Sequence, residues 1–171
     1  MSENAGEGAP RDLLLEAQAQ IPRLEKLFKF AQPHRVRAQE ISAQGIVADG
    51  TWLELFQYGR HEYLRNLGLM SLEGGAPAPV QALVRQCTVQ FLAPARFDDG
   101  LLIRVRAAYL GHRSTKFEYL ADNVDSGLRH AIGETVLVCT NAQSFQSLAW
   151  PQVWRDRLAE FEGGDLQQGQ R

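Results

Sequence analysis

The chain has 171 residues, of which 44% are hydrophobic and 22% are charged. These proportions are typical of one compact domain whose core needs no disulfide or metal to hold it together. Eighteen basic and 20 acidic residues give a formal net charge of −2, which argues against a general nucleic-acid-binding protein. An anionic ligand would therefore need a local group of basic residues.

Two features of the chain bear on its cellular compartment. Cys87 and Cys139 lie far apart, with no Cys-x-x-Cys or Cys/His metal pattern. We expect two reduced, buried thiols, with a disulfide or a nucleophilic cysteine as the alternative. Residues 1–10 lack the basic and apolar regions of a signal peptide, and no apolar run approaches the ~20 residues that cross a bilayer. The sequence therefore predicts a cytoplasmic protein with no membrane span.

The first part of the chain changes from polar to apolar. Residues 1–10 are rich in Gly, Ala, Glu and Ser and predict a disordered tail. Over residues 11–32, apolar side chains at helical spacing predict a helical extension that packs on the domain, and Pro33 ends it. Residues 34–45 begin with alternation, which predicts a strand that runs into a glycine-containing loop.

Residues 51–67 carry the clearest helical pattern. Thr51 and Glu54 have the spacing of a capping box, and Gly68 stops the helix. A broad apolar stripe follows the cap, formed by Trp52, Leu55, Phe56, Gly59, Tyr63, Leu64 and Leu67. Glycine inside a helix costs about 1 kcal/mol relative to alanine, so we expect another backbone to pack closely against Gly59.

Beyond a linker rich in glycine and proline, the hydrophobic period changes to two. Turn signals separate four long segments with this period, residues 80–93, 101–111, 115–124 and 132–147. Successive strands that are joined by tight turns are antiparallel. A last helix is expected at residues 151–162, and a frayed end at 163–171.

One apolar helix and one long antiparallel sheet must cover each other. A curved sheet wrapped around the helix does this economically, and this arrangement is the hot-dog fold. The sequence therefore predicts an α+β protein with a hot-dog domain at residues 33–148. The extra N- and C-terminal helices at 11–32 and 151–162 flank it.

Motifs along the chain resemble the branch of hot-dog proteins that includes 4-hydroxybenzoyl-CoA thioesterase and the Tol-Pal-associated thioesterase. That branch has an aspartate loop with Gly-(Ile/Val)-Val, then a helix with an Ala-Arg pair, and later a Pro-Ala-x-aromatic-Asp-Asp turn. The matching stretches here are Ser42-Ala43-Gln44-Gly45-Ile46-Val47, Gly59-Arg60-His61-Glu62-Tyr63-Leu64 and Pro94-Ala95-Arg96-Phe97-Asp98-Asp99. The resemblance covers residues 34–148 and implies an acyl-CoA thioesterase.

Thioester hydrolysis in this branch implies an acidic side chain that attacks the carbonyl or activates water. It also implies a backbone N–H at the helix N-terminus that stabilises the oxyanion. The usual aspartate falls on Ser42, and the N–H donor falls on Asp49. Since a serine without a base is a poor nucleophile, an ordinary turn hydroxyl is the alternative for Ser42. Glu40 and Glu54 are carboxylates that could replace the aspartate; a salt bridge or solvated strand end for Glu40, and a capping box for Glu54, are their structural alternatives.

A second arrangement without the acid is also implied. Enediyne polyketide thioesterases resemble this branch, lack the acid, and use a polar loop residue with a helix arginine. Those positions are Ser42 and Arg60 here, so Arg60 would hold an oxyanion or carboxylate near the thioester. A helix-surface salt bridge with Glu62 or Asp98 is the alternative for Arg60.

The resemblance places contacts to coenzyme A or phosphopantetheine at Arg113, Ser114, Lys116 and Arg96; solvated surface charges are the alternative. No metal and no separate cofactor are expected, because CoA or phosphopantetheine is part of the substrate. Hot-dog domains usually pair through sheet edges. The resemblance therefore implies a homodimer, or a homotetramer built as a dimer of dimers.

Three functions stay open. The first is hydrolysis of an acyl-CoA or acyl-carrier-protein thioester at a site that lacks the usual acid. The second is a catalytically inactive hot-dog protein that binds an acyl-thioester or a protein partner. The third is a hot-dog dehydratase, which ranks last because its catalytic histidine should lie near the helix start, and His61 does not.

Overall fold

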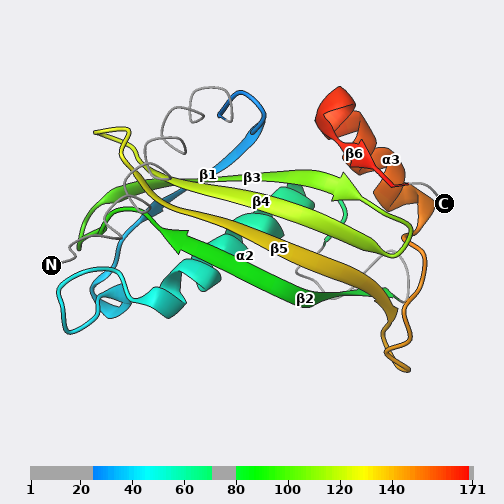
Figure 1. Cartoon of the computed structure of the whole chain (residues 1–171), viewed down its shortest axis with the longest axis horizontal. Helices are drawn as coiled ribbons and strands as arrows, with labels where there is room; N and C mark the ends of the chain where they lie inside the picture. Colours follow the sequence, from blue (N-terminus) through cyan, green and yellow to red (C-terminus); the bar gives the residue numbers. More distant parts are fainter. Residues whose placement is uncertain (1–24, 71–79, 170–171) are drawn as a thin grey trace, which may run out of the picture.

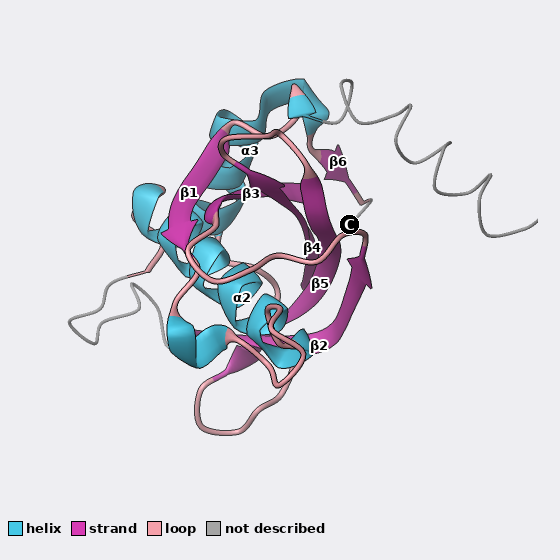
Figure 2. Ribbon diagram, turned by 90° about the vertical axis from the view of Figure 1, so that its left-hand side faces the viewer, coloured by secondary structure: helices cyan, strands magenta, loops and turns pink. Residues whose placement is uncertain are grey.

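A computed structural model describes residues 25–70 and 80–169 of the chain. Its main sheet is antiparallel, with the strand order β1-β3-β4-β5-β2. The strands are β1 (Phe30–Arg35), β2 (Val80–Phe91), β3 (Gly100–Leu110), β4 (Ser114–Asn123) and β5 (Arg129–Asn141). The helix α2, Asp49–Asn66, runs behind this sheet (Figure 1), and Figure 2 shows the strands curving around it. The α+β class, the long central helix and the wrapped antiparallel sheet are therefore as predicted.

Two glycines let α2 approach the sheet closely. A Cβ on Gly59 would lie 3.0 Å from the Ile103 side chain and 3.1 Å from that of Val105, both on β3. A Cβ on Gly133 of β5 would come within 2.6 Å of the Phe56 ring. The close neighbours of Gly59 are thus side chains of β3, rather than the backbone that the sequence led us to expect.

The helix begins two residues earlier than predicted. Ala48 is its N-cap, in an extended conformation (φ −67°, ψ 146°), and makes no side-chain cap hydrogen bond. Thr51 is consequently the third residue of the helix, and the predicted capping box with Glu54 does not form. Glu54 is exposed to solvent.

The N-terminal part also differs from the prediction. The expected tail at residues 1–10, and the part of the expected helix that precedes Glu25, lie outside the described residues. From Phe30 the chain is a strand, because β1 pairs with β3 from Phe30↔Val105 to Arg35↔Gly100. Pro33 fits within β1 because an edge strand has one side on which a missing N–H costs no ladder bond. A short 3-10 helix, η1 (Ala38–Glu40), replaces the continuation of the strand.

The C-terminal helix α3, Gln152–Glu162, closes the sheet at the C-terminal end of α2. Arg157 Nη1 donates to the Leu67 carbonyl at 2.8 Å. Glu162 Oε1 accepts hydrogen bonds from the Tyr63 hydroxyl at 2.6 Å and from the Ala107 N–H at 2.9 Å. These bonds join α3 to both the central helix and the bulge of β3.

The described part of the segment that we expected to be frayed, residues 163–169, contains regular structure, and residues 170–171 lie outside the described residues. A short 3-10 helix, η2 (Gly163–Asp165), follows α3. Strand β6, Gln167–Gln168, then pairs in parallel with Tyr109 and Leu110 of β3. Leu166 is buried between them, which gives an apolar reason for the order.

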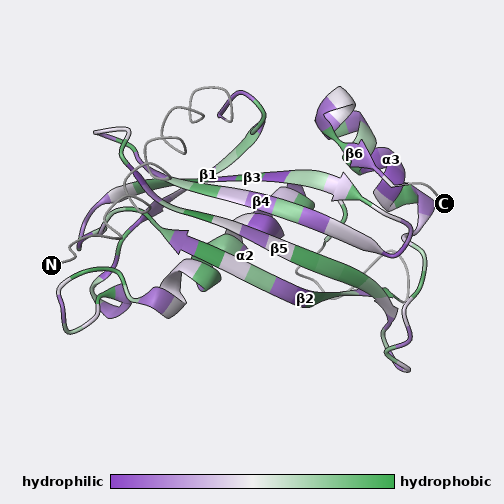
Figure 3. Ribbon diagram, viewed as in Figure 1, coloured by the Kyte–Doolittle hydropathy of each residue, from purple (hydrophilic) through white to green (hydrophobic). Residues whose placement is uncertain are grey.

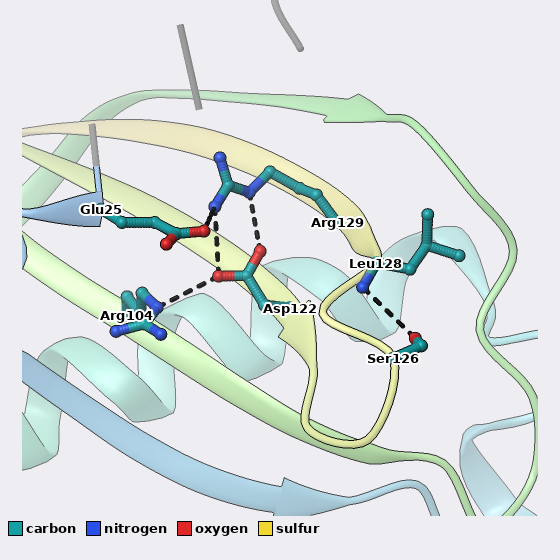
Figure 4. A network of polar contacts seen from close by, with 6 residues as sticks. All are labelled: Glu25, Arg104, Asp122, Ser126, Leu128 and Arg129. Atoms are coloured by element: carbon teal, nitrogen blue, oxygen red, sulfur yellow. Dashed lines mark hydrogen bonds and ion pairs between the residues drawn. The ribbon is translucent and has the colours of Figure 1, made fainter. Parts of the chain in front are cut away.

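The face of the sheet turned away from α2 carries an ion network. Asp122 of β4 accepts from Arg129 at 2.7 Å and from Arg104 at 3.1 Å. Arg129 also pairs with Glu25 at 3.0 Å (Figure 4), so the network ties the N-terminal segment to three strands. Successive side chains of a strand point to opposite faces of the sheet, so charged residues can occupy this face while apolar ones face α2. Figure 3 shows the hydrophilic and hydrophobic bands along the strands.

Strand β2 forms one edge of the sheet and is largely exposed. Its apolar side chains Leu83, Val84 and Phe91 are 38%, 49% and 54% exposed.

Both cysteines are free; Cys139 is buried as expected, but Cys87 on β2 is exposed. Among the helices of residues 25–70 and 80–169, none has the length and apolar content needed to cross a membrane.

Candidate functional site

The loop that leads into α2 is closed by Ser42. Its backbone N–H and its hydroxyl both donate to the Ile46 carbonyl, at 2.8 and 2.9 Å. Gly45 donates back to the Ser42 carbonyl at 2.9 Å and has a positive φ of 76°, which glycine adopts without strain. The hydroxyl proton of Ser42 is therefore already donated within the turn, as expected if Ser42 is an ordinary turn hydroxyl.

The next residues fix the mouth of the helix. Val47 N–H donates to the Ala95 carbonyl and Ala48 N–H donates to the Glu40 carbonyl, both at 2.9 Å. Asp49 follows as the first residue of α2. The first N–H groups of a helix have no acceptor within it, and the helix dipole makes this end partly positive. The Asp49 N–H is thus held by a braced loop at a site suited to an anionic oxygen.

Two carboxylates line a cavity of about 390 Å³ on the β1 side of α2. Glu40 Oε2 accepts from the Arg37 N–H at 2.8 Å and contacts His34 Nε2 at 2.9 Å. Glu40 lies in η1 and not at the predicted strand end, and the His34 contact is its salt bridge. Glu54 reaches the same cavity from the second turn of α2, together with Tyr58. Only Glu54 of the two carboxylates is largely exposed to solvent.

Arg60 occupies the opposite side of α2. Its side chain is buried, with 5% of the residue exposed, and Nη1 donates to the Tyr119 hydroxyl at 2.8 Å. The helix-surface salt bridge considered for Arg60 does not form, because Glu62 pairs with Arg65 and Asp98 pairs with Arg35. Arg60 lines a second cavity, of about 260 Å³, between α2 and the edge strand β2.

The charge of Arg60 has no anionic partner in the part of the chain that the structure describes. Burial raises the pKa of Tyr119, and the charge of Arg60 opposes this without reversing it. Tyr119 is therefore a neutral phenol that accepts a hydrogen bond and does not neutralise the guanidinium. A buried charge without a counter-ion is costly, so an anion from outside the chain would be favoured here.

The four basic or polar residues expected at CoA do not meet within the chain. Arg113 and Ser114 lie at the β3–β4 hairpin, where Arg113 donates to Ser147 at 3.1 Å. Arg96 lies before β3, at its other end, and β3 is 11 residues long, roughly 35 Å. Lys116 already pairs with two carboxylates, Glu118 at 3.0 Å and Glu134 at 3.2 Å.

The surroundings of Lys116 also set its protonation. Burial lowers the pKa of Lys116, but hydrogen bonds and charges from Glu118 and Glu134 outweigh it and raise the pKa above its usual value. Lys116 is therefore a charged residue held within the sheet surface. A phosphate would have to compete with two carboxylates for it.

The structure separates the predicted site residues into three groups. Ser42 and Asp49 form the loop and the helix mouth, Glu40 and Glu54 share the β1-side cavity, and Arg60 stands alone toward β2. Sequence reasoning missed the residues that accompany them, His34 and Tyr58 in one cavity and Gln57, Cys87, Tyr119 and Thr135 near Arg60. Within the described ranges, no group of three or more His, Cys, Asp or Glu side chains is arranged to hold a metal ion.

Comparisons with known proteins identify the family of the chain. A family model described as the Thioesterase-like superfamily matches residues 36–158. The acyl-CoA thioester hydrolase YbgC of Escherichia coli O6:H1 is 28% identical over 133 residues, which cover 78% of this chain and 96% of that protein. The chloroplastic acyl-acyl carrier protein thioesterase ATL3 of Arabidopsis thaliana is 29% identical over 72 residues, 42% of this chain and 37% of that protein.

The fold is shared with solved structures as well. The PA5185 protein from Pseudomonas aeruginosa strain PAO1 has a TM-score of 0.69 and 28% identity. The match covers 79% of this chain and 92% of that one. The central helix and the wrapped sheet therefore belong to a shared fold.

Proposed function

Because this chain belongs to the Thioesterase-like superfamily, we propose that it hydrolyses acyl thioesters of coenzyme A or of an acyl carrier protein. The activities for which YbgC and ATL3 are named support these two substrate classes. The observation that carries the proposal is the N–H of Asp49 at the mouth of α2. The two residues before it are held by hydrogen bonds of 2.9 Å, from the Val47 N–H to the Ala95 carbonyl and from the Ala48 N–H to the Glu40 carbonyl. Asp49 is the first residue of α2, so its N–H has no acceptor within the helix.

In this proposal the thioester oxygen accepts the Asp49 N–H. The carbonyl gains negative charge as water attacks, and a fixed N–H with the helix dipole behind it stabilises that charge more than it stabilises the substrate. Removing one such donor typically costs 10²–10³-fold in rate. The Asp49 carboxylate is exposed, so it can point into solvent and away from the oxyanion.

We assign the general base to Glu54, with Glu40 as the alternative. Glu54 is exposed in the cavity, and long side chains on a helix lean toward its N-terminus. Glu40 is the weaker candidate, because its Oε2 already contacts His34 Nε2 and accepts from the Arg37 N–H, which favours a structural role. The Ser42 hydroxyl serves the turn in this scheme, since its proton is donated to Ile46.

We further propose that the protein acts as a homodimer paired through β2. This strand has 12 residues and exposed apolar side chains, and such an edge tends to pair with another strand. Antiparallel pairing would set the Phe91 end of one β2 opposite the partner's Val80 end. The partner's Arg113 would then approach the end of the sheet that carries Arg96 and the helix mouth.

The second function, a catalytically inactive protein that binds acyl-thioesters, also has an observation in its favour. The loop residue Ser42 spends its hydroxyl proton within the turn and carries no acid. A protein that retained the helix mouth without a working base would bind a thioester and leave it intact.

Thiol release from acyl-CoA and acyl-carrier-protein thioesters tests the proposal. The wild type should release thiol, and Glu54→Gln should lower the rate by about 10²–10⁴-fold, the usual contribution of general acid–base catalysis. Glu40→Gln tests the alternative base, and Glu160→Gln, an exposed acid on α3, is the matched control. A folded wild type that binds acyl-CoA and releases no thiol would instead establish the binding function.

A further inference from the structure

The cavity that contains Arg60 follows one side of α2 from its beginning. Its helical lining is Leu53, Phe56, Gln57 and Arg60, which is the i, i+3, i+4, i+7 spacing of one helix face. Leu53 stands one turn after Asp49. The cavity therefore leads from the proposed position of the thioester carbonyl toward a buried guanidinium.

The Asp49 N–H and Arg60 serve different parts of a ligand. They are 11 residues apart on α2, about 16 Å along the axis at 1.5 Å per residue. An arginine side chain leans back toward the helix N-terminus, which shortens this span without closing it. One carbonyl oxygen therefore cannot contact both donors, and Arg60 would meet the far end of an acyl group.

The near part of the cavity suits a hydrocarbon chain. Leu53 and Phe56 line it from the helix. Its far end is different, since Arg60 is buried, positive, and bonded only to the neutral Tyr119 hydroxyl among the described residues. Glu134 also lines the cavity, but its carboxylate pairs with Lys116 at 3.2 Å.

We propose that Arg60 binds a carboxylate at the distal end of the acyl group, so that the substrates are thioesters of dicarboxylic acids. The inference rests on the proposed function, which places the thioester carbonyl at the Asp49 N–H. The carboxylate supplies the counter-ion that the chain does not, and a guanidinium binds carboxylates through paired N–H groups. The apolar lining holds the methylene chain between the two ends.

The test compares suberyl-CoA with octanoyl-CoA, which has the same number of carbons and ends in a methyl group. The wild type should have a kcat/KM about tenfold or more higher for suberyl-CoA, in line with a hydrogen bond to a charged group. Arg60→Met should lower the suberyl-to-octanoyl ratio by about 10- to 100-fold. Arg60→Lys keeps the charge and should restore part of the ratio.

Two further variants keep the test independent of folding. Gln57 is exposed and lies one turn before Arg60, so Gln57→Glu places a competing carboxylate beside the guanidinium and should lower the same ratio. Arg65→Met removes an exposed arginine of α2 that pairs with Glu62 at 2.8 Å, and the ratio should not change. An equal loss for both substrates in Arg60→Met, or no preference in the wild type, would overturn the inference.

Failure of the hydrolase proposal can be told apart from failure of this one. If the wild type releases no thiol, calorimetry can compare the binding of two non-hydrolysable thioether analogues, one of suberyl-CoA and one of octanoyl-CoA. Tighter binding of the carboxyl-terminated analogue, weakened by Gln57→Glu, would support the distal carboxylate site. Equal binding of the two analogues would reject it.

Discussion

The two ends of α2 are finished in opposite ways. At its C-terminal end, Arg157 caps the Leu67 carbonyl and Glu162 joins Tyr63 to β3. At its N-terminal end, Ala48 provides no side-chain cap and the Asp49 N–H precedes any helical acceptor. An uncapped helix end forgoes about 1 kcal/mol. One end of α2 therefore contributes stability, while the other keeps its N–H donors available for a ligand.

The largest effect is expected at the closed end. Leu158 of α3 is fully buried, and Leu158→Ala should lower the free energy of unfolding by about 2–5 kcal/mol. Urea denaturation measures this loss, with Val153→Ala on the exposed side of α3 as the control. Turnover below the melting transition should stay near that of the wild type. A loss of activity without a loss of stability would mean that the two ends are not separate.

The open end can be broken with one atom group. Asp49→Pro removes the N–H, and proline suits the first position of a helix; the extended Ala48 before it, with ψ 146°, also suits it. The rate should fall by about 10²–10³-fold, equivalent to about 2.7–4 kcal/mol. Stability should change little. Asp49→Ala, which keeps the N–H, is the control, and equal rates for these two variants would refute the donor role.

The closed end should respond to pH. Burial raises the pKa of Glu162 above its ordinary 4.5, although hydrogen bonds from Tyr63 and Ala107 oppose the shift. A carboxyl whose pKa is raised by folding holds more protons in the folded state, so its contribution is complete below pH 4.5 and declines as pH rises through the folded pKa. Glu162→Gln should remove this decline. Chemical denaturation of both proteins from pH 4.5 upward measures it, and identical slopes would contradict the assignment.

The smallest effect is expected at the loop. Ser42→Ala removes the bond from the hydroxyl to Ile46 and leaves the backbone bond between the same residues. The free energy of unfolding should fall by about 1 kcal/mol. The kcat of the variant should stay within about threefold of the wild type, because in this proposal the Ser42 hydroxyl does not touch the reacting atoms. A loss of turnover comparable with that of Asp49→Pro would return Ser42 to the active site.

Local patterns were enough for the helix and the long strands. The stripe that includes Phe56 and Tyr63 predicts α2, and the period of two predicts β3 to β5, because burial on one face dictates both patterns. The same period predicts β2, although β2 is largely exposed in this chain. The strand β1 begins at Phe30, four residues before the start of the predicted strand. Its position depends on pairing with β3, about 70 residues away along the chain. Long-range pairing leaves little local signal.

The site was predictable only in part, for the same reason. Arg60 lies four residues after Phe56 and three before Tyr63, so the helical stripe itself indicates that it faces the sheet. Its partner Tyr119 could not be named, because that contact depends on how β4 is placed against α2. The shared cavity of Glu40 and Glu54 likewise depends on η1, which replaced an expected strand.

One small contact has a consequence for the topology of the whole polypeptide. Lys29 Nζ donates to the Phe161 and Glu162 carbonyls, at 3.0 and 2.8 Å, so the start of β1 meets the end of α3. A circular permutant could be joined by a linker across this contact and opened at the exposed turn Asp125–Gly127. It would keep the pairings among β1, β2, β3, β4 and β5, and its new ends would lie away from the residues that line the cavity beside Arg60.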